Sequence, residues 1–495
     1  MLVLFFIISL AAAFLIAMFG RKSKLFCHLT SILATLSLFL LSLYALYLVN
    51  KSGVIVYNIG GWIPPLGICL VLDGFSAFML LVLNFISFIV AIYALAYMEK
   101  YTDKYRFYCL FMCMITGMNG VILAGDIFNL FVCLEIASVA SYALVAFGTE
   151  AEELEAAFKY IVMGAIAASF ILLGIGLLYA YTSTLNMADI SLAIAHKGFN
   201  TVILLVSVLF IAGFGTKSAL VPFHGWLPDA HSSAPAAVSA MLSGVLIKVL
   251  GIYSLVRIFF NIFGVNQIIL MILAILGAIS ILVGAILAIG QWDLKRLLAY
   301  SSISQIGYVI LSLSLATPLG ILGGLFHLFN HSVFKSLLFL NSGAIEYATG
   351  CRNLKEMGGL KEKMPITANT SWIASLSISG IPPFSGFWSK LLIIIACVQA
   401  NRIGLALIAV AGSIITLAYF MKVQKVIFYG KLNPAFDKIK EVPVSMRLAM
   451  IVLAVLCLLG GILFIPRILV YFLKPAVSVL LLGTNYAFTV LGGVL

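Results

Sequence analysis

Long apolar stretches alternate with short polar segments along the whole chain. Most of these stretches are as long as the roughly 20 residues that a helix needs to cross a bilayer. They lack the alternating pattern of about ten residues that is typical of porin-type strands. We count fourteen stretches and expect each to be a membrane-spanning helix. They cover residues 2–20, 26–49, 72–97, 105–125, 127–147, 157–182, 201–224, 234–262, 266–290, 295–314, 318–346, 366–399, 402–428 and 445–473. An apolar tail over 476–495 is left outside this count, as either an interfacial segment or one further span.

The composition favours an all-α polytopic membrane protein. Of the 495 residues, 63% are hydrophobic and 9% are charged, whereas a soluble protein has about 25% charged residues. These values exclude a water-soluble globular chain, a disordered chain and a disulfide-stabilised scaffold. The eight cysteines include no C-x-x-C pair, and the nearest two, Cys109 and Cys113, lie one helical turn apart. We therefore expect no metal site and no disulfide in this chain.

The formal net charge of +12 indicates a membrane orientation rather than a nucleic-acid partner. Basic residues of membrane proteins collect in cytoplasmic loops, where they face anionic lipid headgroups. With both termini outside, most loop lysines and arginines fall on the cytoplasmic side. The outer side receives Lys51, Lys197, Arg257, Arg402, Arg467 and Lys474. This bias predicts an even number of spans in the inner (cytoplasmic) membrane of a cell, with both termini outside.

Four lysines, Lys217, Lys248, Lys335 and Lys390, lie well inside apolar stretches. A lysine near the middle of a bilayer costs roughly 2.5 to 3.5 kcal/mol unless it pairs, deprotonates or contacts water. The alternative is snorkelling, in which the long side chain carries its ammonium group to the headgroups. For Lys248 the nearest span end is about 18 Å away at 1.5 Å per residue, which is too far. These lysines are therefore candidate members of an ion pathway.

Glu135 is the acidic counterpart of these lysines. It either locks two helices in register or, if it faces Lys217, forms an ion pair whose opening changes the proton affinity of the lysine. His327, His331 and Lys335 are spaced by four residues, which places them on one stripe of a helix. A lone histidine inside a membrane is usually a packing residue. Two histidines in line with a lysine favour a proton wire, because histidine titrates near neutral pH.

Two predicted spans contain proline near one of these lysines. Pro222 follows Lys217 by a few residues, and the pair Pro382 and Pro383 precedes Lys390. Proline removes an intrahelical hydrogen bond, and broken backbone at membrane depth survives only beside protein or water. Paired broken helices are typical of transporters built from inverted repeats. The alternative is a proline kink that serves packing only.

Several polar residues fall near the predicted cytoplasmic ends of the spans. His224, Asp229 and His231 are placed in an inner loop, and Asp293 lies next to Lys295. Most of these are expected to be ordinary loop or mouth residues. Lys295, with His224 and His231, is the candidate route by which protons are taken up from the cytoplasm.

Several spaced motifs resemble those of a known family. They are Gly125-Asp126-Ile127-Phe128-Asn129-Leu130-Phe131 running to Glu135, Lys217 with Trp226-Leu227-Pro228-Asp229-Ala230-His231, His331-Ser332-Val333-Phe334-Lys335, and Gly380-Ile381-Pro382-Pro383-Phe384-Ser385-Gly386-Phe387-Trp388-Ser389-Lys390. The chain resembles the antiporter-like subunits shared by respiratory complex I, Mrp-type multisubunit Na+/H+ antiporters and membrane-bound hydrogenases. One subgroup has a long C-terminal amphipathic helix, for which this chain, ending at Leu495, has no room, and another has glutamate in place of Lys390. The resemblance is therefore nearest to the D-type Mrp protein or its hydrogenase equivalent.

The resemblance implies a fourteen-helix fold with two inverted five-helix repeats, in which helices 7 and 12 are broken. The expected parts are 1–103 (three helices), 104–262 (first repeat), 263–430 (second repeat) and 431–495 (last helix and tail). It also implies a subunit that binds no cofactor and has no redox or hydrolytic chemistry of its own. Such a subunit works with other membrane subunits of an antiporter, hydrogenase or complex I-like assembly. The implied proton path consists of Glu135, Lys217, Lys248, His327, His331, Lys335 and Lys390.

Two other functions stay open. In a structural scaffold subunit the charges would only lock helices together. A quinone- or haem-binding redox subunit would need ligands that face each other across helices, whereas His327 and His331 share one helix. The sequence also leaves open the host complex, the direction of proton movement and the passage of Na+, although the mostly basic intramembrane charge favours protons.

Overall fold

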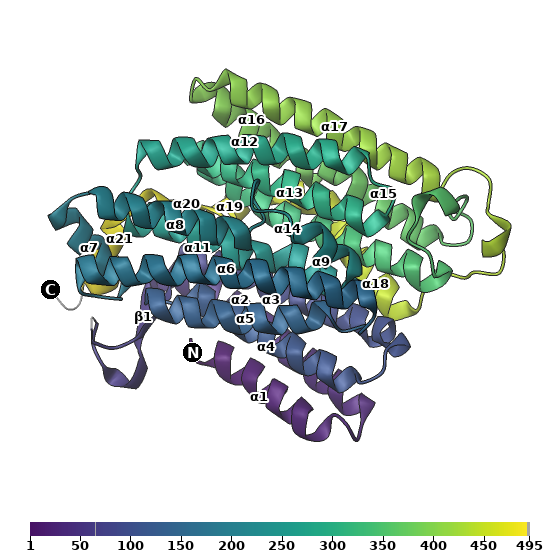
Figure 1. Ribbon diagram of the computed structural model, residues 1–495, viewed down its shortest axis with the longest axis horizontal. Coiled ribbons are helices and arrows are strands. Elements are labelled where there is room, and N and C mark those ends of the chain that lie inside the picture. Colours follow the sequence, from purple (N-terminus) through teal and green to yellow (C-terminus); the bar gives the residue numbers. More distant parts are fainter. Residues whose placement is uncertain (65, 493–495) are drawn as a thin grey trace.

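The computed structural model describes residues 1–64 and 66–492. Its long helices run side by side along the longest axis of the molecule (Figure 1). Among the described residues, nine helices are long and apolar enough to cross a membrane. The chain is thus a mostly helical, multi-pass membrane protein, as the apolar pattern predicts.

The first half of the chain forms one side of the bundle, and a short β-hairpin lies with α7 at one of its ends (Figure 1). In the hairpin, β1 (Ile55–Asn58) pairs antiparallel with β2 (Cys69–Leu72). The helices are α1 (Leu4–Phe19), α2 (Lys24–Ser52), α3 (Gly74–Tyr97), α4 (Lys104–Leu123), α5 (Ile127–Val145), α6 (Ala151–Thr182), α7 (Met187–Lys197), α8 (Thr201–Lys217), α9 (Leu227–Ser233), α10 (Ala236–Met241) and α11 (Ser254–Val256).

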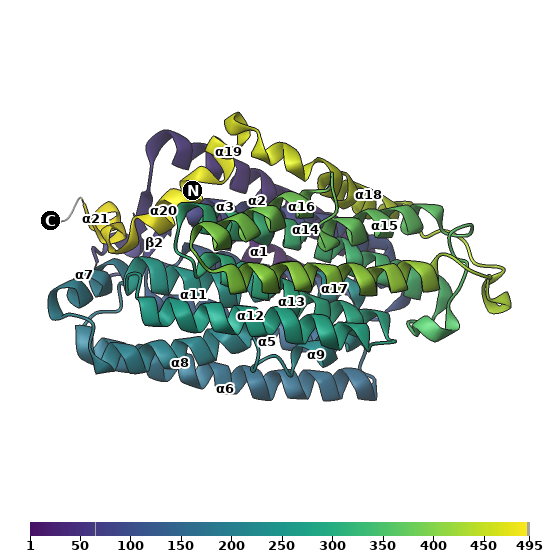
Figure 2. The ribbon, with the colours of Figure 1, turned by 90° about the horizontal axis from the view of Figure 1, so that it is seen from above.

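The second half adds the remaining helices. They are α12 (Gln267–Ile289), α13 (Leu294–Leu313), α14 (Pro318–Thr349), α15 (Pro365–Ser379), α16 (Ser385–Gln399), α17 (Ile403–Ile427), α18 (Val444–Leu459), α19 (Pro466–Phe472), α20 (Lys474–Leu481) and α21 (Tyr486–Leu491). The last three follow one edge of the bundle (Figure 2), where α20 contacts α3 and α21 contacts α7. Each is too short to cross a bilayer, so the described part of the tail over 476–495 forms no single span; residues 493–495 lie outside the description.

Two gaps interrupt the helical structure, one between α8 and α9 and the other between α15 and α16. They contain the proline stretches that the sequence singles out. In the first gap the N–H of Val221 donates to Oγ of Ser280 on α12 at 3.0 Å, so a neighbouring helix satisfies the freed backbone. In the second gap Gly380 has a φ of +81°, a conformation that residues with a Cβ adopt only with strain.

The segment Ala236–Ile262 is a fully buried helix with an unusual backbone. It joins α10 and α11 through π-helical turns at Leu242–Leu246, Lys248–Tyr253 and Arg257–Ile262. A π-helical turn replaces the usual i→i+4 hydrogen bonds by i→i+5 bonds, and such turns occur frequently at functional sites.

A buried ion pair fastens this helix to α3. Nη1 and Nη2 of Arg257 lie 2.7 and 2.9 Å from the two carboxylate oxygens of Asp73, and both side chains are buried. Asp73 also caps the first turn of α3. The guanidinium group lies over the rings of Phe75, Tyr253 and Tyr486, 5.1 to 5.4 Å from their centroids. The sequence places Arg257 and Asp73 at outer helix ends but does not reveal that they bind each other.

Removal of one partner of this pair is expected to destabilise the protein. The variant Asp73→Ala leaves Arg257 charged and buried, and breaking a buried pair in this way costs about 3–5 kcal/mol. Thermal unfolding of the purified protein in detergent measures the effect. The matched variant Asp437→Ala removes the partner of Lys363 in a largely exposed pair and is expected to cost less than about 1 kcal/mol. Equal losses in the two variants would contradict a clamp at Arg257.

Candidate functional site

Buried charged side chains cross the middle of the bundle, from α5 at one edge to α16 at another. The four intramembrane lysines, Lys217, Lys248, Lys335 and Lys390, are each at most 3% exposed. None of them therefore extends to the lipid headgroups, and the snorkelling interpretation does not apply. Each ammonium group is instead stabilised inside the protein by a different set of neighbouring groups.

The expected contact between Glu135 and Lys217 is present. Lys217 is the last residue of α8, and its Nζ lies 3.1 Å from Oε1 of Glu135 on α5. The same ammonium group donates to Oγ of Ser138 at 2.9 Å and to the hydroxyl of Tyr142 at 3.3 Å. The Glu135 side chain is 29% exposed and lines an apolar surface groove between α4 and α5. The ion pair thus joins the interior to the surface of the bundle.

Lys248 binds to the backbone of its own helix. Its Nζ donates to the carbonyl oxygens of Ser243 at 2.6 Å and Gly244 at 2.7 Å. These carbonyls lie in a π-helical turn. Lys248 is therefore held by two neutral acceptors rather than by a carboxylate.

Serines connect Lys248 with Lys335. Oγ of Ser243 lies 2.7 Å from Oγ of Ser302 on α13. The adjacent Ser301 accepts a hydrogen bond of 2.7 Å from Nζ of Lys335, which also donates to the carbonyl oxygen of Leu298 at 2.7 Å. The contacts are continuous from the central helix through α13 to α14.

The predicted stripe on α14 is buried and extends to α16. The rings of His327 and His331 stack with centroids 6.4 Å apart. His327 contacts Oγ of Ser389 at 3.0 Å through Nδ1 and Oε1 of Gln305 at 3.2 Å through Nε2. Both ring nitrogens of His331 are buried without a hydrogen-bond partner among the described residues. The ring of Tyr308 lies between this stripe and the last lysine, with its centroid 5.6 Å from that of His327 and 4.8 Å from Nζ of Lys390.

Lys390 lies beside the second helix gap. Its Nζ is 4.8 Å from the centre of the Tyr308 ring and has no hydrogen-bond partner among the described residues. A Cβ added at Gly380 would lie 2.9 Å from Cδ of Lys390, so the glycine leaves room for the lysine. Lys390 also lines a pocket of about 230 Å³ between α16 and α17.

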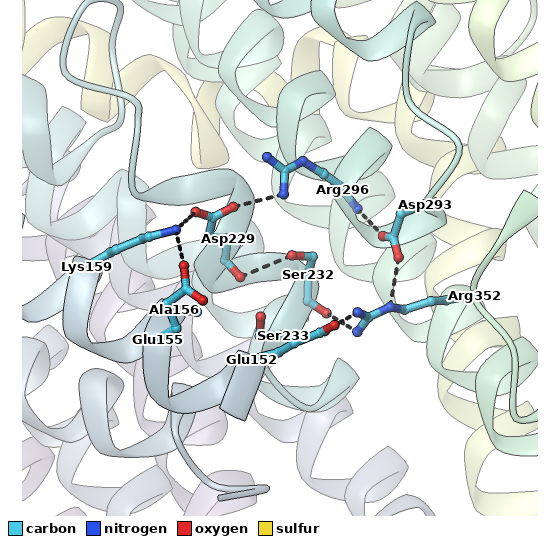
Figure 3. A pocket seen from close by; sticks show the side chains of 10 residues that line it. All are labelled: Glu152, Glu155, Ala156, Lys159, Asp229, Ser232, Ser233, Asp293, Arg296 and Arg352. Atoms are coloured by element: carbon cyan, nitrogen blue, oxygen red, sulfur yellow. Dashed lines mark hydrogen bonds and ion pairs between the residues drawn. The ribbon is translucent and has the colours of Figure 1, made fainter. Parts of the chain in front are cut away.

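A charged pocket of about 370 Å³ opens at the end of the bundle where α6 begins and α12 ends. Its carboxylates and cations come from both halves of the chain and face one another (Figure 3). The ion pairs are Lys159–Asp229 and Arg296–Asp229, both at 2.9 Å, Arg352–Asp293 at 2.8 Å, and Arg352–Glu152. Asp229 thus connects α6 with α13, and Arg352 connects α6 with the start of α13.

Burial raises the pKa of Asp293 in this pocket, although the backbone N–H of Arg296 and the charge of Arg352 act in the opposite direction. For Arg352, burial disfavours the charged form, but Asp293 and Glu152 more than compensate and raise its pKa. The pocket therefore combines permanent cations with a carboxylate that takes up a proton more readily than an exposed aspartate does.

Two of the three uptake candidates lie behind this pocket. Lys295, next to Arg296, binds Oε2 of Glu346 at 2.7 Å and the carbonyl oxygen of Ala234 at 3.2 Å. The placement of His231 in an inner loop is wrong, because His231 is buried within α9 and its ring lies against Phe339 of α14.

His224, in contrast, does not join this group. It is half-buried in the gap between α8 and α9 rather than in an inner loop. No hydrogen bond joins it to Lys295 or to His231 within the described part of the chain.

Sequence reasoning missed three polar residues of the site, namely Glu346, Gln305 and Ser389. Glu346 lies eleven residues after Lys335, or about three helical turns, so it shares a face of α14 with that lysine. This spacing could have identified Glu346 from the sequence. Gln305 and Ser389 carry no signal of their own, because uncharged polar residues are common in membrane helices and only the fold brings them to His327.

Residues 124–416 match the family model described as NADH:quinone oxidoreductase/Mrp antiporter, TM. The chain belongs to this family. Residues 62–108 also match the model described as NADH-Ubiquinone oxidoreductase (complex I), chain 5 N-terminus. The resemblance inferred from the sequence motifs is confirmed.

Curated relatives of the family cover most of this chain. It is 38% identical over 397 residues to the N-type subunit of the NADH-quinone oxidoreductase of Desulforudis audaxviator, which is 79% of each chain. It is 35% identical over 402 residues to the D-type subunit of the Na(+)/H(+) antiporter of Alkalihalophilus pseudofirmus, which is 80% of this chain and 81% of that one.

Solved structures extend the likeness to almost the full length. A chain of the Mrp complex from Dietzia sp. has a TM-score of 0.93 at 29% identity. A chain of the membrane-bound sulfane sulfur reductase, an archaeal respiratory membrane complex, has a TM-score of 0.91 at 29% identity. Each comparison covers 99% of both chains, so the fold described above is that of this family.

The variant Gly380→Ala is expected to disturb the lysine end of the site. It places a Cβ 2.9 Å from Cδ of Lys390 and adds strain at a positive φ, which costs about 1–2 kcal/mol before any displacement of the lysine. Thermal unfolding of the purified protein measures this loss. The control Gly404→Ala meets nothing within 4 Å and is expected to leave the transition unchanged. A neutral Gly380→Ala variant would show that the gap is wider than described.

Proposed function

We propose that this chain is a proton-translocating, antiporter-like subunit of a larger ion-pumping membrane complex, and that protons move along its buried polar path. The observation that carries the proposal is the set of buried lysines and histidines between Glu135 and Lys390, each at most 3% exposed. Inside a membrane such groups are costly, and they usually mark ion or proton pathways. Membership of the antiporter family supports the same conclusion.

The pair of Glu135 and Lys217 acts as the gate. While it is closed, the carboxylate compensates the charge of Lys217. When a neighbouring subunit at the α4–α5 groove draws Glu135 away, that compensation is lost, and the positive potential at nearby buried groups rises steeply because the local dielectric constant is low. Lys248, held by neutral carbonyls, then gives up a proton to the next group of the path.

Lateral transfer uses the serines and histidines. From Lys248 the route passes Ser243 and the α13 serines to Lys335, and the α14 stripe continues to Lys390. Buried polar groups nearly always have a hydrogen-bond partner. We infer that water binds to His331 and to Nζ of Lys390, and that this water carries protons between them.

Proton uptake takes place at the charged pocket of Figure 3. Asp293 takes up protons there, and the Lys295–Glu346 pair and His231 transfer them inward. The pocket contains seven charged groups, four of them acidic, so it attracts protons without a strong net charge.

The topology behind this path consists of fourteen spans with two inverted repeats, over 104–262 and 263–430, flanked by 1–103 and 431–495. Equivalent backbone bonds support it. At one end of the bundle the N–H groups of Ile127 and Met187 donate to the carbonyl oxygens of Leu185 and Gly125, respectively. At the other end the N–H groups of Leu294 and Leu354 donate to the carbonyl oxygens of Arg352 and Trp292, respectively. The two donors are separated by the same number of residues in both pairs. The gap between α8 and α9 is the break in helix 7, and the gap between α15 and α16 is the break in helix 12.

We further propose that both termini lie outside the inner membrane of a cell, because this orientation places most basic loops in the cytoplasm. The relatives are named as subunits of a quinone oxidoreductase and of a Na+/H+ antiporter. By analogy, the partners of this chain are other membrane subunits of such an assembly. Protons are its cargo, and any Na+ passes elsewhere.

The central test is the charge state of Lys248. The variant Lys248→Ala is expected to reduce proton transport by the assembled complex at least about tenfold, in line with the loss of one proton-transfer group. Lys248→Arg is expected to be equally inactive, because arginine keeps its charge and does not release a proton. Proton-gradient formation in membrane vesicles measures both.

Lys197→Ala, at an exposed lysine near one end of the bundle, is the matched control and should transport normally. In a scaffold subunit, Lys248→Arg would preserve transport because the structural charge is kept. Active transport by Lys248→Arg in a fully assembled complex would therefore refute the proposed path.

Proton uptake should depend on Asp229. The variant Asp229→Asn leaves Lys159 and Arg296 without their shared carboxylate, so the pocket becomes more positive and repels protons. Transport is expected to fall a few-fold at about 0.05 M salt and to recover towards 1 M, where the Debye length is about 3 Å.

The control Asp437→Asn removes an exposed carboxylate that binds Lys363 at the same end of the bundle. It should not affect transport. A loss in Asp229→Asn that is equal at all salt concentrations would contradict an electrostatic role for the pocket.

A further inference from the structure

A large apolar pocket of about 550 Å³ lies between α2, α3, α14 and the segment from α18 to α19. Its volume falls in the range of about 300–1,000 Å³ that is usual for small-molecule sites. Aromatic pairs form its walls, with ring centroids 5.5 Å apart for Phe39 and Phe85 and 5.4 Å apart for Phe329 and Phe472. In Figure 2 the C-terminal helices lie beside α2 and α3 along this edge of the bundle.

The pocket lies in the half of the bundle that ends at the β-hairpin. On α2 its lining begins at Leu46, six residues before the C-terminus at Ser52, and ends at Phe39. From Leu46 to Phe39 the helix rises about 10 Å at 1.5 Å per residue, and half of the hydrocarbon core is about 15 Å thick. The pocket therefore accommodates part of an acyl chain from a single leaflet.

The mouth of the pocket is basic. Arg467 is the one charged side chain among the described residues that line it. The hydrogen bond of 3.0 Å from Asn50 to the carbonyl oxygen of Tyr471 brings Lys51 and Lys474 to the same region. No aspartate or glutamate follows Glu441 in the chain.

Exposed tyrosines mark the headgroup level at this mouth. Tyr47 and Tyr471 are 57% and 63% exposed, and tyrosine is enriched where a membrane meets water. The arrangement is an apolar cavity below an aromatic and cationic rim.

We propose that this pocket binds one anionic phospholipid, with an acyl chain in the cavity and the phosphate at Arg467. The cationic rim selects a negative headgroup, since a basic residue near an anionic lipid surface contributes about 1 kcal/mol. The lipid comes from the leaflet at the β-hairpin end of the bundle.

Two other occupants fit less well. A quinone needs hydrogen-bond donors for the oxygens at both ends of its ring, whereas Arg467 and Tyr471, the described lining side chains that carry donors, both lie on α19. A helix of another subunit has a diameter of about 10–12 Å and packs along several turns, whereas the lining on α2 covers about two turns, from Phe39 to Leu46.

The bound lipid also has a consequence for the polar path. Val333, on the wall of the pocket, lies between His331 and Lys335 on α14, so a single helix separates the pocket from the path. An acyl chain in the cavity keeps water away from this side of α14. The lipid therefore acts as a seal against proton leakage.

The test is retention of lipid by the assembled complex after purification in detergent. Native mass spectrometry in the presence of equal amounts of phosphatidylglycerol and phosphatidylcholine measures how much of each lipid stays bound. The variants are Arg467→Gln, Arg467→Lys and Leu43→Trp, the last of which fills the pocket from its exposed edge. The controls are Arg402→Gln, at an exposed arginine between α16 and α17, and Leu407→Trp, at an exposed leucine of α17.

Wild type, Arg467→Lys and both controls are expected to retain phosphatidylglycerol in preference to phosphatidylcholine. Arg467→Gln is expected to lose about fivefold of this preference, the factor equivalent to about 1 kcal/mol. Leu43→Trp should lose the bound lipid of either class.

Equal retention of the two lipids by wild type would overturn the proposal, as would retention unaffected by Leu43→Trp. Displacement of the bound molecule by added quinone would point to the other occupant and likewise overturn it. These results leave the proton path untouched, because its test is transport by the Lys248 variants.

Discussion

The structure depends on one constraint, the solvation of ammonium groups in a medium that contains no bulk water. Each intramembrane lysine meets it differently. Lys217 has a carboxylate and two hydroxyl groups, Lys248 has two backbone carbonyls, Lys335 has a hydroxyl and a carbonyl, and Lys390 faces an aromatic ring. Within the described residues, a counter-ion is present in the first of these environments and in none of the other three. The charge at the other three is therefore stabilised by dipoles alone, which compensate a full charge only in part.

The irregular backbone follows from the same constraint. In an ideal α-helix each interior carbonyl already accepts one backbone hydrogen bond, so a lysine shares it as a second donor, as Lys335 does at Leu298 of α13. The π-helical turns around Lys248 change that pattern, and the helix gaps near Lys217 and Lys390 interrupt it. Such irregular backbone is tolerated at membrane depth because protein surrounds it. Irregular backbone therefore lies at or near Lys217, Lys248 and Lys390, whereas Lys335 lies within the continuous helix α14.

The sequence singled out the intramembrane lysines, Glu135 and the histidine stripe, but not the charged Glu346. A lysine in an apolar stretch is conspicuous by itself, and the spacing of His327, His331 and Lys335 needs only the helical period. The contact of Glu135 with Lys217 was also foreseeable, since Glu135 is the acidic group deep in its span. The sequence did not show how deeply a residue lies within a broken helix. It therefore indicates a loop position for His231, although this residue is buried.

Pairings between distant spans were equally hidden. Arg257 and Asp73 are separated by 184 residues, and neither stands deep in its apolar stretch, so both resemble ordinary helix ends. Glu346 was overlooked for the same reason, although its spacing from Lys335 was visible. Uncharged partners such as Gln305 acquire a role only through the packing of α13 against α14.

The choice of partners also bears on whether the charges are structural. A scaffold gains most from a buried lysine that is permanently paired, because removing the counter-ion leaves an uncompensated charge that costs several kcal/mol. Lys248 and Lys335 have neutral partners, and these same carbonyl and hydroxyl oxygens still accept other donors when the lysine has lost its proton. Such a site tolerates both charge states. A lysine with a purely structural role does not need to tolerate both charge states. A lysine that takes up and releases a proton in every cycle requires this tolerance.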